Sequence, residues 1–413
     1  MADASVEIHV DIGVQEILLA ASQHDVPRLR QLIRSSNDLE NPVNVKDPET
    51  GYTPLHAAIA ACEQDFSDLK DSAPNGMHSD AGAVNEVQER ILHTGRDTVK
   101  FLLQEGAIWN DLDENNESPG CLARRLGLTE LYELMVDAGV RAELLLSHLE
   151  GYQQLSDHDT EEDYETQAQE KAEVPTSSVT AEGSIESSDI SATEPVTSSR
   201  YLQSNLTFQF DRLLDEDQNG VMMAWESEIM TRTARKLLPS PGLRVLNIGH
   251  GMGIVDHSFQ EQSPSSHHIV EAHPDVVAEM RRMGWHEKPG VVIHEGKWQE
   301  ILPRLIEENE TFDAIYYDTF AESYSDFRFF FSEQVIVLLD QTGKWGFFNG
   351  MGADRQISYD VYQKVVEIDL FEAGYDVEWE DIKVPQLEEE WAGVRRRYWV
   401  IDNYRLPICK YIE

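Results

Sequence analysis

The sequence predicts a helical repeat region followed by a doubly wound α/β domain whose sheet is mostly parallel. From about residue 201 to the end, short apolar runs alternate with helix-like stretches, a pattern typical of parallel strands joined by helices. A glycine-rich turn follows the first apolar run of this part. Residues 151–200, rich in Asp, Glu, Ser and Thr, separate it from the preceding chain. We therefore expect two folded parts.

The chain length and the acidic stretch define three regions. A length of 413 residues is enough for two or three domains at ~100–200 residues each. Residues 1–150 are expected to form the helical repeat domain, and residues 201–413 the α/β domain. Residues 151–200 carry few apolar side chains and therefore cannot bury a core. They are expected to form a flexible, self-repelling acidic linker.

The composition limits the classes of partner. The formal net charge is -43, from 76 acidic and 33 basic residues, and it disfavours contact with the phosphates of nucleic acid. A basic partner is the natural counterpart, although part of the acidity could merely solvate the linker and exposed helix faces. No apolar run is long enough for a membrane span. The cysteines Cys62, Cys121 and Cys409 lie far apart, so we expect an intracellular protein without a disulfide framework or a zinc site.

The first 150 residues contain the elements of short helical repeats. Residues 53–58, TPLHAA, resemble the ankyrin signature T-P-L-H-x-A, in which Thr and Pro begin a helix and small residues allow close packing. Pro119 opens a degenerate unit roughly two ~33-residue periods after Pro54, and the polar stretch Asp65–Asn85 fits no repeat. Ankyrin repeats bind proteins, so we expect docking of a partner or substrate. A stabilising cap without a ligand is the alternative.

Apolar and amphipathic stretches predict the elements of the α/β part. The strands are expected at Val245–Ile248, Ile269–Glu271, Val291–His294, Ala314–Asp318 and Lys344–Asn349. The helices are expected at Asp275–Met283, Ile301–Asn309 and Phe327–Leu339. Arg395–Arg397 is expected to flank a late antiparallel strand rather than to bind nucleic acid.

The glycine turn indicates a cofactor pocket. Gly249, Gly251 and Gly253 follow the first strand and allow the backbone to approach a ligand closely. Glu271 follows about 20 residues later, where such folds place the carboxylate that binds ribose hydroxyls. The spacing G-H-G-M-G lacks the last glycine of the dinucleotide motif, and S-adenosylmethionine, which has a ribose but no phosphate, fits better. Ordinary glycine turns at the end of a buried strand are the alternative.

Two carboxylates are candidates for the chemistry. Asp318 ends a buried strand, where ligands of α/β folds gather, although it could simply cap the next helix. Glu226 lies within an apolar, helix-like segment at residues 221–230, and a half-buried acid needs partners; a solvated acid on an amphipathic face is the alternative. Trp298 could form an aromatic wall for an adenine ring or belong to the core.

Five ordered motifs make a resemblance close. They are MMAWESEIM, NIGHGMGIVD, IVEAHPDV, EGKWQEI and FDAIYYDTF. Together they resemble the guanidinoacetate methyltransferase family and the related fungal type IV protein arginine methyltransferases, which join such a domain to ankyrin-like repeats. The resemblance implies a Rossmann-like fold that uses S-adenosylmethionine, with Glu226 and Asp318 holding a guanidinium. The implied cofactor-binding residues are Tyr201, Met230, His250, Gly251, Met252, Gly253, Ile254, Val255, Glu271, Ala272, His273, Trp298, Gln299 and Asp318.

One departure from the small-molecule enzymes bears on the substrate. They carry Leu-Thr-Ser after the asparagine of the fifth strand, whereas this chain has Asn349-Gly350-Met351-Gly352. A site opened by glycines suits a larger substrate, such as an arginine within a protein. The family then implies monomethylation of the internal δ-nitrogen of arginine in a large-subunit ribosomal protein, docked in part by the repeats, in the cytoplasm and nucleus.

Two alternative functions remain open from the sequence. One is a small-molecule guanidino methyltransferase, and the other is a noncatalytic ankyrin scaffold with an inert methyltransferase fold. The histidines near the glycine turn lack paired ligand spacing, so no metal site is expected.

Overall fold

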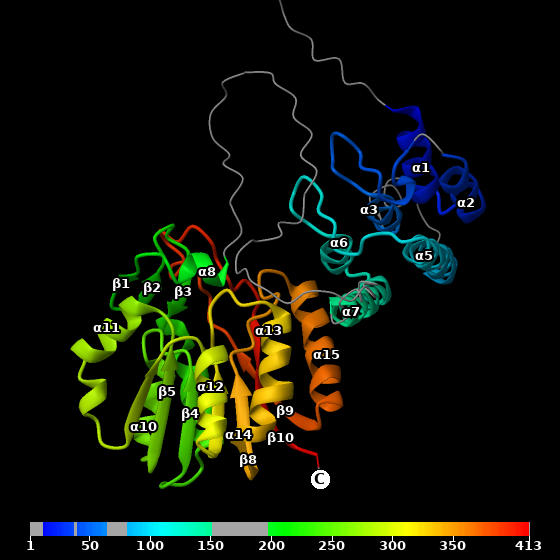
Figure 1. Cartoon of the computed structure of the whole chain (residues 1–413). Coiled ribbons are helices and arrows are strands. Elements are labelled where there is room, and N and C mark those ends of the chain that lie inside the picture. Colours follow the sequence, from blue (N-terminus) through cyan, green and yellow to red (C-terminus); the bar gives the residue numbers. More distant parts are fainter. Residues whose placement is uncertain (1–10, 37–38, 64–80, 151–196, 413) are drawn as a thin grey trace, which may run out of the picture.

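The structure is a computed structural model that describes residues 11–36, 39–63, 81–150 and 197–412. Its described parts form a helical N-terminal half and a larger α/β half (Figure 1). The linker expected at 151–200 lies outside the described residues except for its last four positions.

The N-terminal half consists of helices that pack in neighbouring pairs. They are α1 (Ile12–Ser22), α2 (Val26–Ser35), η1 (Pro42–Asn44), α3 (Pro54–Ala60), α5 (Ala81–Gln104), α6 (Pro119–Arg125) and α7 (Thr129–Glu150). Helix α3 packs between α1 and α6. Helix α2 packs on α1, α5 on α3, and α7 on α6. The stretch 65–85 was expected to fit no repeat. Its last residues belong to α5, because that helix begins at Ala81.

Two matching caps begin the short helices α3 and α6. The Thr53 side chain accepts a hydrogen bond from the His56 backbone amide, and the His56 side chain accepts one from the Thr53 amide. The Ser118 hydroxyl likewise accepts from the Cys121 amide. A proline follows each cap, at the helical position whose N–H needs no partner. The TPLH-like motifs therefore do fix helix starts.

The α/β half is built on a seven-stranded sheet in the order β6-β5-β4-β7-β8-β10-β9. The strands are β4 (Arg244–Ile248), β5 (Ser266–Glu271), β6 (Val291–Glu295), β7 (Phe312–Tyr317), β8 (Leu339–Phe347), β9 (Tyr375–Lys383) and β10 (Asn403–Tyr411). In this sheet β10 pairs antiparallel with both β8 and β9, and the other neighbouring strands pair in parallel. All five predicted strands are confirmed, and the late antiparallel strand is β10, which begins beyond the Arg395–Arg397 run.

Helices cover both faces of this sheet, as a doubly wound fold requires. The larger ones are α9 (Ser227–Leu237), α10 (Ile254–Glu261), α11 (Pro274–Arg282), α12 (Trp298–Glu307), α13 (Tyr324–Phe329), η4 (Phe330–Val335), α14 (Ile336–Leu338) and α15 (Gln356–Glu372). Successive residues of β4 point to opposite faces: Val245 packs in one hydrophobic cluster and Leu246 in another. The helices predicted at 275–283, 301–309 and 327–339 are confirmed, the last as α13, η4 and α14 in succession.

A small antiparallel sheet precedes the large one and corrects one expectation. It contains β1 (Thr207–Phe208), β2 (Arg212–Leu214) and β3 (Gly220–Met223), after the short helix α8 (Ser198–Tyr201). The segment 221–230 was expected to be helix-like throughout. It instead runs from β3 through the 3-10 turn η2 (Ala224–Glu226) into α9, because β3 pairs with β2 in the small sheet and Met222 and Met223 are buried in the core.

The two halves share a hydrophobic core. Helix α7 packs along α15 (Figure 1), and Ile357, Val361 and Val365 of α15 belong to the core cluster of the N-terminal half. A Cβ on Gly139 would lie 2.6 Å from the Val361 side chain, and one on Gly120 would lie 1.7 Å from Ile357. Glycines therefore allow the close approach of the halves.

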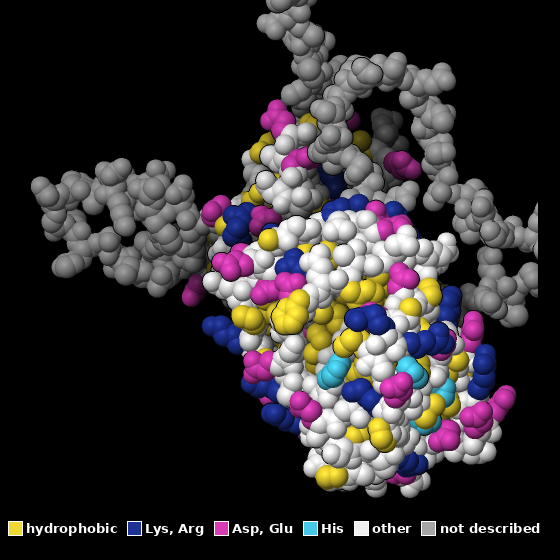
Figure 2. Space-filling view, turned by 90° about the vertical axis from the view of Figure 1, so that its left-hand side faces the viewer, with side chains coloured by type: hydrophobic (Ala, Val, Ile, Leu, Met, Phe, Trp, Pro, Cys, Tyr) yellow, Lys and Arg dark blue, Asp and Glu magenta, His cyan; other side chains and the backbone are white. Residues whose placement is uncertain are grey.

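The surface does not display the acidity of the chain uniformly. The face shown in Figure 2 mixes Lys and Arg with Asp and Glu, and hydrophobic side chains gather near its middle. Among the described residues, no helix is long and apolar enough to cross a bilayer.

Candidate active site

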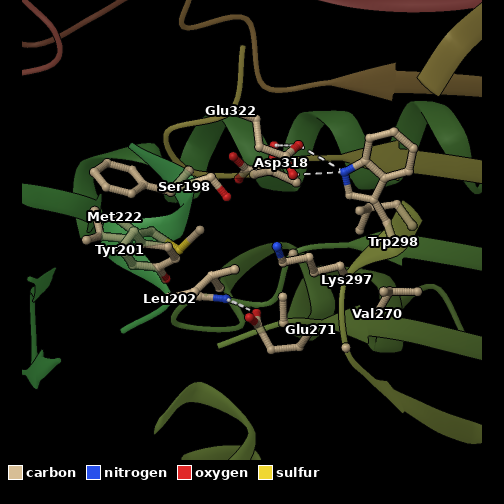
Figure 3. Close-up of a pocket in the computed structure, with 18 residues that line it drawn as sticks. Ser198, Tyr201, Leu202, Met222, Val270, Glu271, Lys297, Trp298, Asp318 and Glu322 are labelled. Atoms are coloured by element: carbon tan, nitrogen blue, oxygen red, sulfur yellow. Dashed lines mark hydrogen bonds between the residues drawn. The ribbon is translucent and has the colours of Figure 1, made fainter. Parts of the chain in front are cut away.

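A cavity lies beyond the carboxyl ends of β4, β5 and β7, where doubly wound sheets bind ligands. We call it the turn cavity. Its walls are Ser198, Tyr201, Leu202, Val221, Met222, Ile248, Gly249, Gly251, Val270, Glu271, Ala272, Gly296, Lys297, Trp298, Asp318, Thr319, Phe320 and Glu322. Figure 3 shows Glu271 and Asp318 on opposite sides of this space. Asp318 was expected to face the pocket of Gly251 and Glu271, and the structure places these three residues in the wall of one cavity.

The backbone conformation of the turn after β4 requires glycine at three positions. Gly249, Gly251 and Gly253 all have positive φ, at 92°, 55° and 73°. A Cβ on Gly249 would meet the Asp318 carbonyl oxygen at 1.9 Å, and one on Gly251 would meet the Met222 side chain at 2.8 Å. The turn therefore closes tightly on both β7 and β3, and only Gly can occupy these positions without strain.

Glu271 ties the end of β5 to this turn. One carboxylate oxygen accepts hydrogen bonds from the His250 amide at 2.8 Å and the Gly251 amide at 3.4 Å, and the other accepts from the His273 amide at 2.7 Å. Each carboxylate oxygen has two acceptor positions. Oε2 uses both of its positions and Oε1 uses one, so the fixed carboxylate retains one acceptor position for a ribose hydroxyl at the cavity wall.

A buried polar network supports the turn from below. The Asp256 carboxylate bonds the His250 ring at 2.6 Å, the His267 ring at 2.8 Å and the Asn247 amide at 2.8 Å. Burial acts to raise the pKa of Asp256, but the two histidines outweigh it and lower that pKa overall. His250, Asp256 and His267 are almost fully buried. The network thus holds an ionised carboxylate beneath the turn and fixes its shape.

Asp318 connects the turn cavity to a second cavity, which contains Glu226 and which we call the acid cavity. The acid cavity is lined by Val221, Glu226, Tyr317, Asp318, Thr319, Phe320, Ala321, Glu322, Ser323, Phe327, Phe347, Phe348, Asn349, Gly350, Met351, Val366, Arg396 and Tyr398. Asp318 lines both spaces, whereas Glu226 lines only the acid cavity. Asp318 and Glu322 thus line both cavities, and Glu226 adds a further carboxylate on the acid-cavity side.

The surroundings of Glu226 and Asp318 favour the binding of a cation. Burial is the largest cause that raises the pKa of Glu226, and the charge of Asp318 raises it further. Burial also raises the pKa of Asp318, together with the charges of Asp256 and Glu271. Glu226 accepts hydrogen bonds from the Tyr398 hydroxyl and the Met223 amide, and Asp318 Oδ2 has no partner among the described residues. A guanidinium, with five donors and a fixed positive charge, matches this pair.

The structure divides the predicted cofactor residues into two groups. Tyr201, Gly251, Glu271, Ala272, Trp298 and Asp318 line the turn cavity. The others lie behind its wall: Met230, His250, Met252, Gly253, Ile254, Val255, His273 and Gln299. Met230 and Val255 are packed in the hydrophobic core, so their side chains do not reach the cavity space.

Two of these outer residues, His273 and Gln299, form hydrogen bonds to residues of the cavity wall. His273 donates its amide to Glu271, and its ring bonds the Tyr201 carbonyl oxygen at 3.0 Å. The Gln299 amide reaches Glu322 at 3.3 Å. Their place is therefore behind the residues that line the space.

Sequence reasoning missed several wall residues of the two cavities. Met222, Lys297, Thr319 and Phe320 lie inside the motifs, whereas the others lie outside them: Ser198, Leu202, Val221, Glu322 and Tyr398. Glu322 accepts hydrogen bonds from the Trp298 indole at 2.9 Å, as Figure 3 shows, and from Thr319 at 3.0 Å. Trp298 is thus both a wall residue and nearly fully buried. Met222 and Lys297 lie within two of the motifs, so the sequence could have indicated them as wall residues.

The glycines after β8 open the acid cavity outward. Gly350 lines the acid cavity and also an outer cavity that includes Gly352, Arg396 and Arg397. The Asn349 amide before them bonds Tyr359 at 3.1 Å and the Arg405 carbonyl at 2.9 Å. Asn349 therefore shapes the wall, and the path outward passes the glycines.

No group of three or more His, Cys, Asp or Glu side chains in the described parts of the chain is arranged to hold a metal ion. His250 and His267, which looked unrelated in sequence, converge on Asp256. Their role is to support the turn.

Comparisons with known proteins agree with this geometry. The family model for guanidinoacetate N-methyltransferase matches residues 203–388. The protein arginine N-methyltransferase 2 of Aspergillus fumigatus is 68% identical over 98% of each chain. This chain belongs to the protein arginine N-methyltransferase 2 family. The protein arginine N-methyltransferase 2 of Emericella nidulans is 65% identical over 100% of each chain.

Solved structures are far more distant from this member of the protein arginine N-methyltransferase 2 family. An S-adenosylmethionine-dependent methyltransferase from Mesorhizobium loti is 15% identical, covers 45% of this chain and 98% of its own, and has a TM-score of 0.33. The fold assignment therefore rests on the strand order and the family match.

S-adenosylmethionine is the cofactor of this protein, and the chemistry of the side chains that line the turn cavity suits it. Glu271 presents a carboxylate for the ribose, Trp298 and Tyr201 supply aromatic surface, and Asp318 supplies a negative charge for the sulfonium. Among the described residues, Asp318 Oδ2 has no hydrogen-bond partner, and a donor or a cation bound in the cavity would supply one.

Proposed function

We propose that this protein methylates the internal δ-nitrogen of an arginine side chain within a protein, once per arginine. The observation that carries the proposal is the position of Asp318, which lines the turn cavity and the acid cavity together. Glu226 supplies a second carboxylate on the acid side only. A guanidinium held between them would lie beside the cofactor cavity.

The residues of the chain account for the main requirements of transfer. S-adenosylmethionine, when bound, supplies a methyl group on a positively charged sulfur. Glu226 and Asp318 would orient the guanidinium so that one nitrogen faces that methyl, and orientation of this kind lowers the barrier. As the new N–C bond forms and the S–C bond breaks, the nitrogen loses a proton. A carboxylate of raised pKa is a suitable acceptor for it.

The outward path supports a protein substrate. The acid cavity and the outer cavity share Phe320, Ala321, Gly350, Arg396 and Tyr398. A guanidinium at the inner end would therefore leave room for the chain that carries it. The net charge of -43 favours a basic protein, such as a large-subunit ribosomal protein, and the resemblance to type IV enzymes supports the δ-nitrogen.

We further propose that the N-terminal helices are ankyrin-like repeats that help to dock this substrate. Three helix pairs, α1 with α2, α3 with α5 and α6 with α7, are stacked in order, and equivalent Thr-Pro and Ser-Pro caps begin α3 and α6. Such stacking of equivalent pairs is the architecture of a solenoid. Substitutions at exposed positions of this half, which leave the shared core intact, would then lower transfer to a protein more than transfer to free arginine.

A small-molecule function is the second candidate, and Arg396 favours it. This exposed arginine lines the acid cavity, where it could pair with the carboxylate of a free guanidino acid. The test incubates the full chain with labelled S-adenosylmethionine and either basic ribosomal proteins or guanidinoacetate, and locates the methyl group by mass spectrometry. N5-methylarginine in a protein is expected. Methyl groups only on terminal nitrogens, or only on guanidinoacetate, would overturn the proposal.

A further inference from the structure

A cavity outside the described site lies where the two halves of the chain meet. Residues from α7, the segment after β7, η4 and α15 enclose it, and its volume is about 680 Å³. That volume falls within the ~300–1,000 Å³ usual for pockets that hold small ligands or side chains. We call it the junction cavity. Neither Glu226 nor the cofactor wall contributes to it.

The charge of the junction cavity is strongly negative. Its walls carry Glu143, Glu333, Asp369 and Glu372 against a single cation, Arg328. Glu333 and Glu372 are exposed, and neither forms an ion pair with another described residue. Two carboxylates at the rim are therefore available to a cation from outside.

Asp369 is the second, independent sign of a ligand. It is only 2% exposed, yet its Oδ1 has no hydrogen-bond partner among the described residues. Its Oδ2 accepts from the Tyr324 hydroxyl at 2.5 Å and lies 3.7 Å from Arg328 Nε. A buried carboxylate oxygen without a partner is costly, and a donor placed in the cavity that Asp369 lines would satisfy it.

The remaining walls are aromatic. Tyr324 and Tyr362 lie with their ring centroids 5.8 Å apart, and Phe329 is 49% exposed at the cavity. Aromatic faces combined with carboxylates suit the planar guanidinium of arginine, which stacks and donates at the same time. The chemistry therefore favours arginine over a neutral side chain.

The junction cavity adjoins the catalytic region through one residue. Ser323 lines both the junction cavity and the acid cavity. We propose that the junction cavity binds a second arginine of the same protein substrate, so that recognition requires two arginines. This rests on the proposed function. It also gives the N-terminal half a direct part in recognition, since Glu143 comes from α7.

The test measures binding without catalysis. The full chain carrying Glu226→Gln and Asp318→Asn is titrated with N-acetyl-arginine amide in a calorimeter, at fixed salt. One saturable site per chain is expected. Adding Glu333→Gln and Glu372→Gln should weaken it about tenfold or more, because two charged acceptors are lost. The matched control adds Glu307→Gln and Glu367→Gln, which change the net charge equally on exposed helix positions.

The outcomes separate the two proposals. Absence of saturable binding in the Glu226→Gln and Asp318→Asn protein would overturn the junction site, as would equal weakening by the control pair. Methyl transfer by the unaltered chain is assayed separately and tests only the proposed function. In that assay, Glu333→Gln with Glu372→Gln should raise KM for a protein substrate and leave kcat unchanged.

Discussion

At the scale of single residues, the site depends on two carboxylates that destabilise each other until a cation arrives. Burial raises the pKa of both Glu226 and Asp318, and the charge of Asp318 raises that of Glu226 further. Such perturbed acids in a cleft are a common mark of function. The Tyr398 hydroxyl donates to Glu226 and holds this acid in place, whereas Asp318 Oδ2 has no hydrogen-bond partner in the described parts of the chain.

Neutralising either acid should separate transfer from cofactor binding. Glu226→Gln and Asp318→Asn are each expected to lower kcat/KM by about 10²–10⁴-fold, because the guanidinium loses an orienting charge and the reaction loses a proton acceptor. S-adenosylmethionine should still bind to both variants because Glu271 is untouched, although more weakly to Asp318→Asn, which loses the charge beside the sulfonium. The matched control is Glu228→Gln, an exposed acid two residues from Glu226. Near-normal transfer in both acid variants, measured with labelled cofactor, contradicts their assignment.

The activity should increase with pH. Below their raised pKa values the two carboxyls are protonated in the empty site and attract a guanidinium weakly. The guanidinium itself stays charged throughout. Therefore kcat/KM should rise as the pH passes upward through the raised pKa values, and substrate binding should release protons. Calorimetry in buffers of different ionisation enthalpy measures that release, and a pH-independent kcat/KM argues against the mechanism.

At the scale of elements, the cofactor site is a contact between the turn after β4 and the end of β5. Three amides of the chain donate to Glu271, and Asp256 supports the same turn from its buried side. The acid of the second strand therefore organises the turn as well as offering an acceptor to a ribose. This dual role explains how a turn without the last glycine of the dinucleotide motif keeps one conformation.

Replacement of Glu271 should weaken cofactor binding by about 10–100-fold. Glu271→Gln keeps the size of the side chain but replaces charged acceptors, and each hydrogen bond to a charged group contributes about 1.5–3 kcal/mol. Titration of the variant with S-adenosylmethionine measures the change. Glu295→Gln, at the end of the neighbouring strand β6 and exposed, is the control and should bind normally. An unchanged dissociation constant for Glu271→Gln would remove this residue from the cofactor site.

The sequence predicted elements better than it predicted side-chain positions. Strands β4 to β8 were located because buried parallel strands are continuous apolar runs. Strand β9, YDVEWEDIK, is an edge strand with alternating exposed acids and gave no such signal. The residues 221–230 were taken as helix because pairing of β3 with β2 cannot be read from apolar content alone.

Side chains within the motifs depend on tertiary contacts that the spacing does not report. Met230 falls on the buried face of α9, whereas Met222, in the same motif, contacts the turn. His250 and His267 meet at Asp256 only because β4 and β5 are neighbours in the sheet. Glu226 and Asp318 were singled out as an acid within an apolar segment and an acid at the end of a buried strand, and the family resemblance decided in favour of a functional role for Glu226.

At the scale of the whole molecule, the two halves are expected to unfold together. Helix α15 gives Ile357, Val361 and Val365 to the core of the N-terminal half, and the Tyr132 hydroxyl bonds Asp360 across the boundary at 2.5 Å. An interface that shares apolar side chains and buried hydrogen bonds couples the stability of both sides. The docking of the halves is therefore part of the fold, and it also places α7 beside the junction cavity.

Gly139→Leu tests this coupling. Even a Cβ at this position would lie 2.6 Å from Val361 and 3.1 Å from the Trp109 ring, and overpacking of this kind costs about 1–3 kcal/mol. Denaturant unfolding followed by tryptophan fluorescence should show one transition in the unaltered chain and two in the variant, with the α/β half retaining cofactor binding. Gly127→Ala is not a suitable control, because the positive φ of Gly127 would strain an alanine. The control is therefore Ala142→Leu, at another position on α7.

The same variant links the fold to recognition. If α7 contributes to substrate docking through Glu143, Gly139→Leu should lower kcat/KM for a protein substrate about tenfold while transfer to a free arginine derivative changes little. Equal losses for both substrates would mean that the interface supports only the stability of the α/β half. A single transition in Gly139→Leu, with unaltered kinetics, would mean that α7 and α15 tolerate the extra volume and that the close approach at Gly139 has no functional consequence.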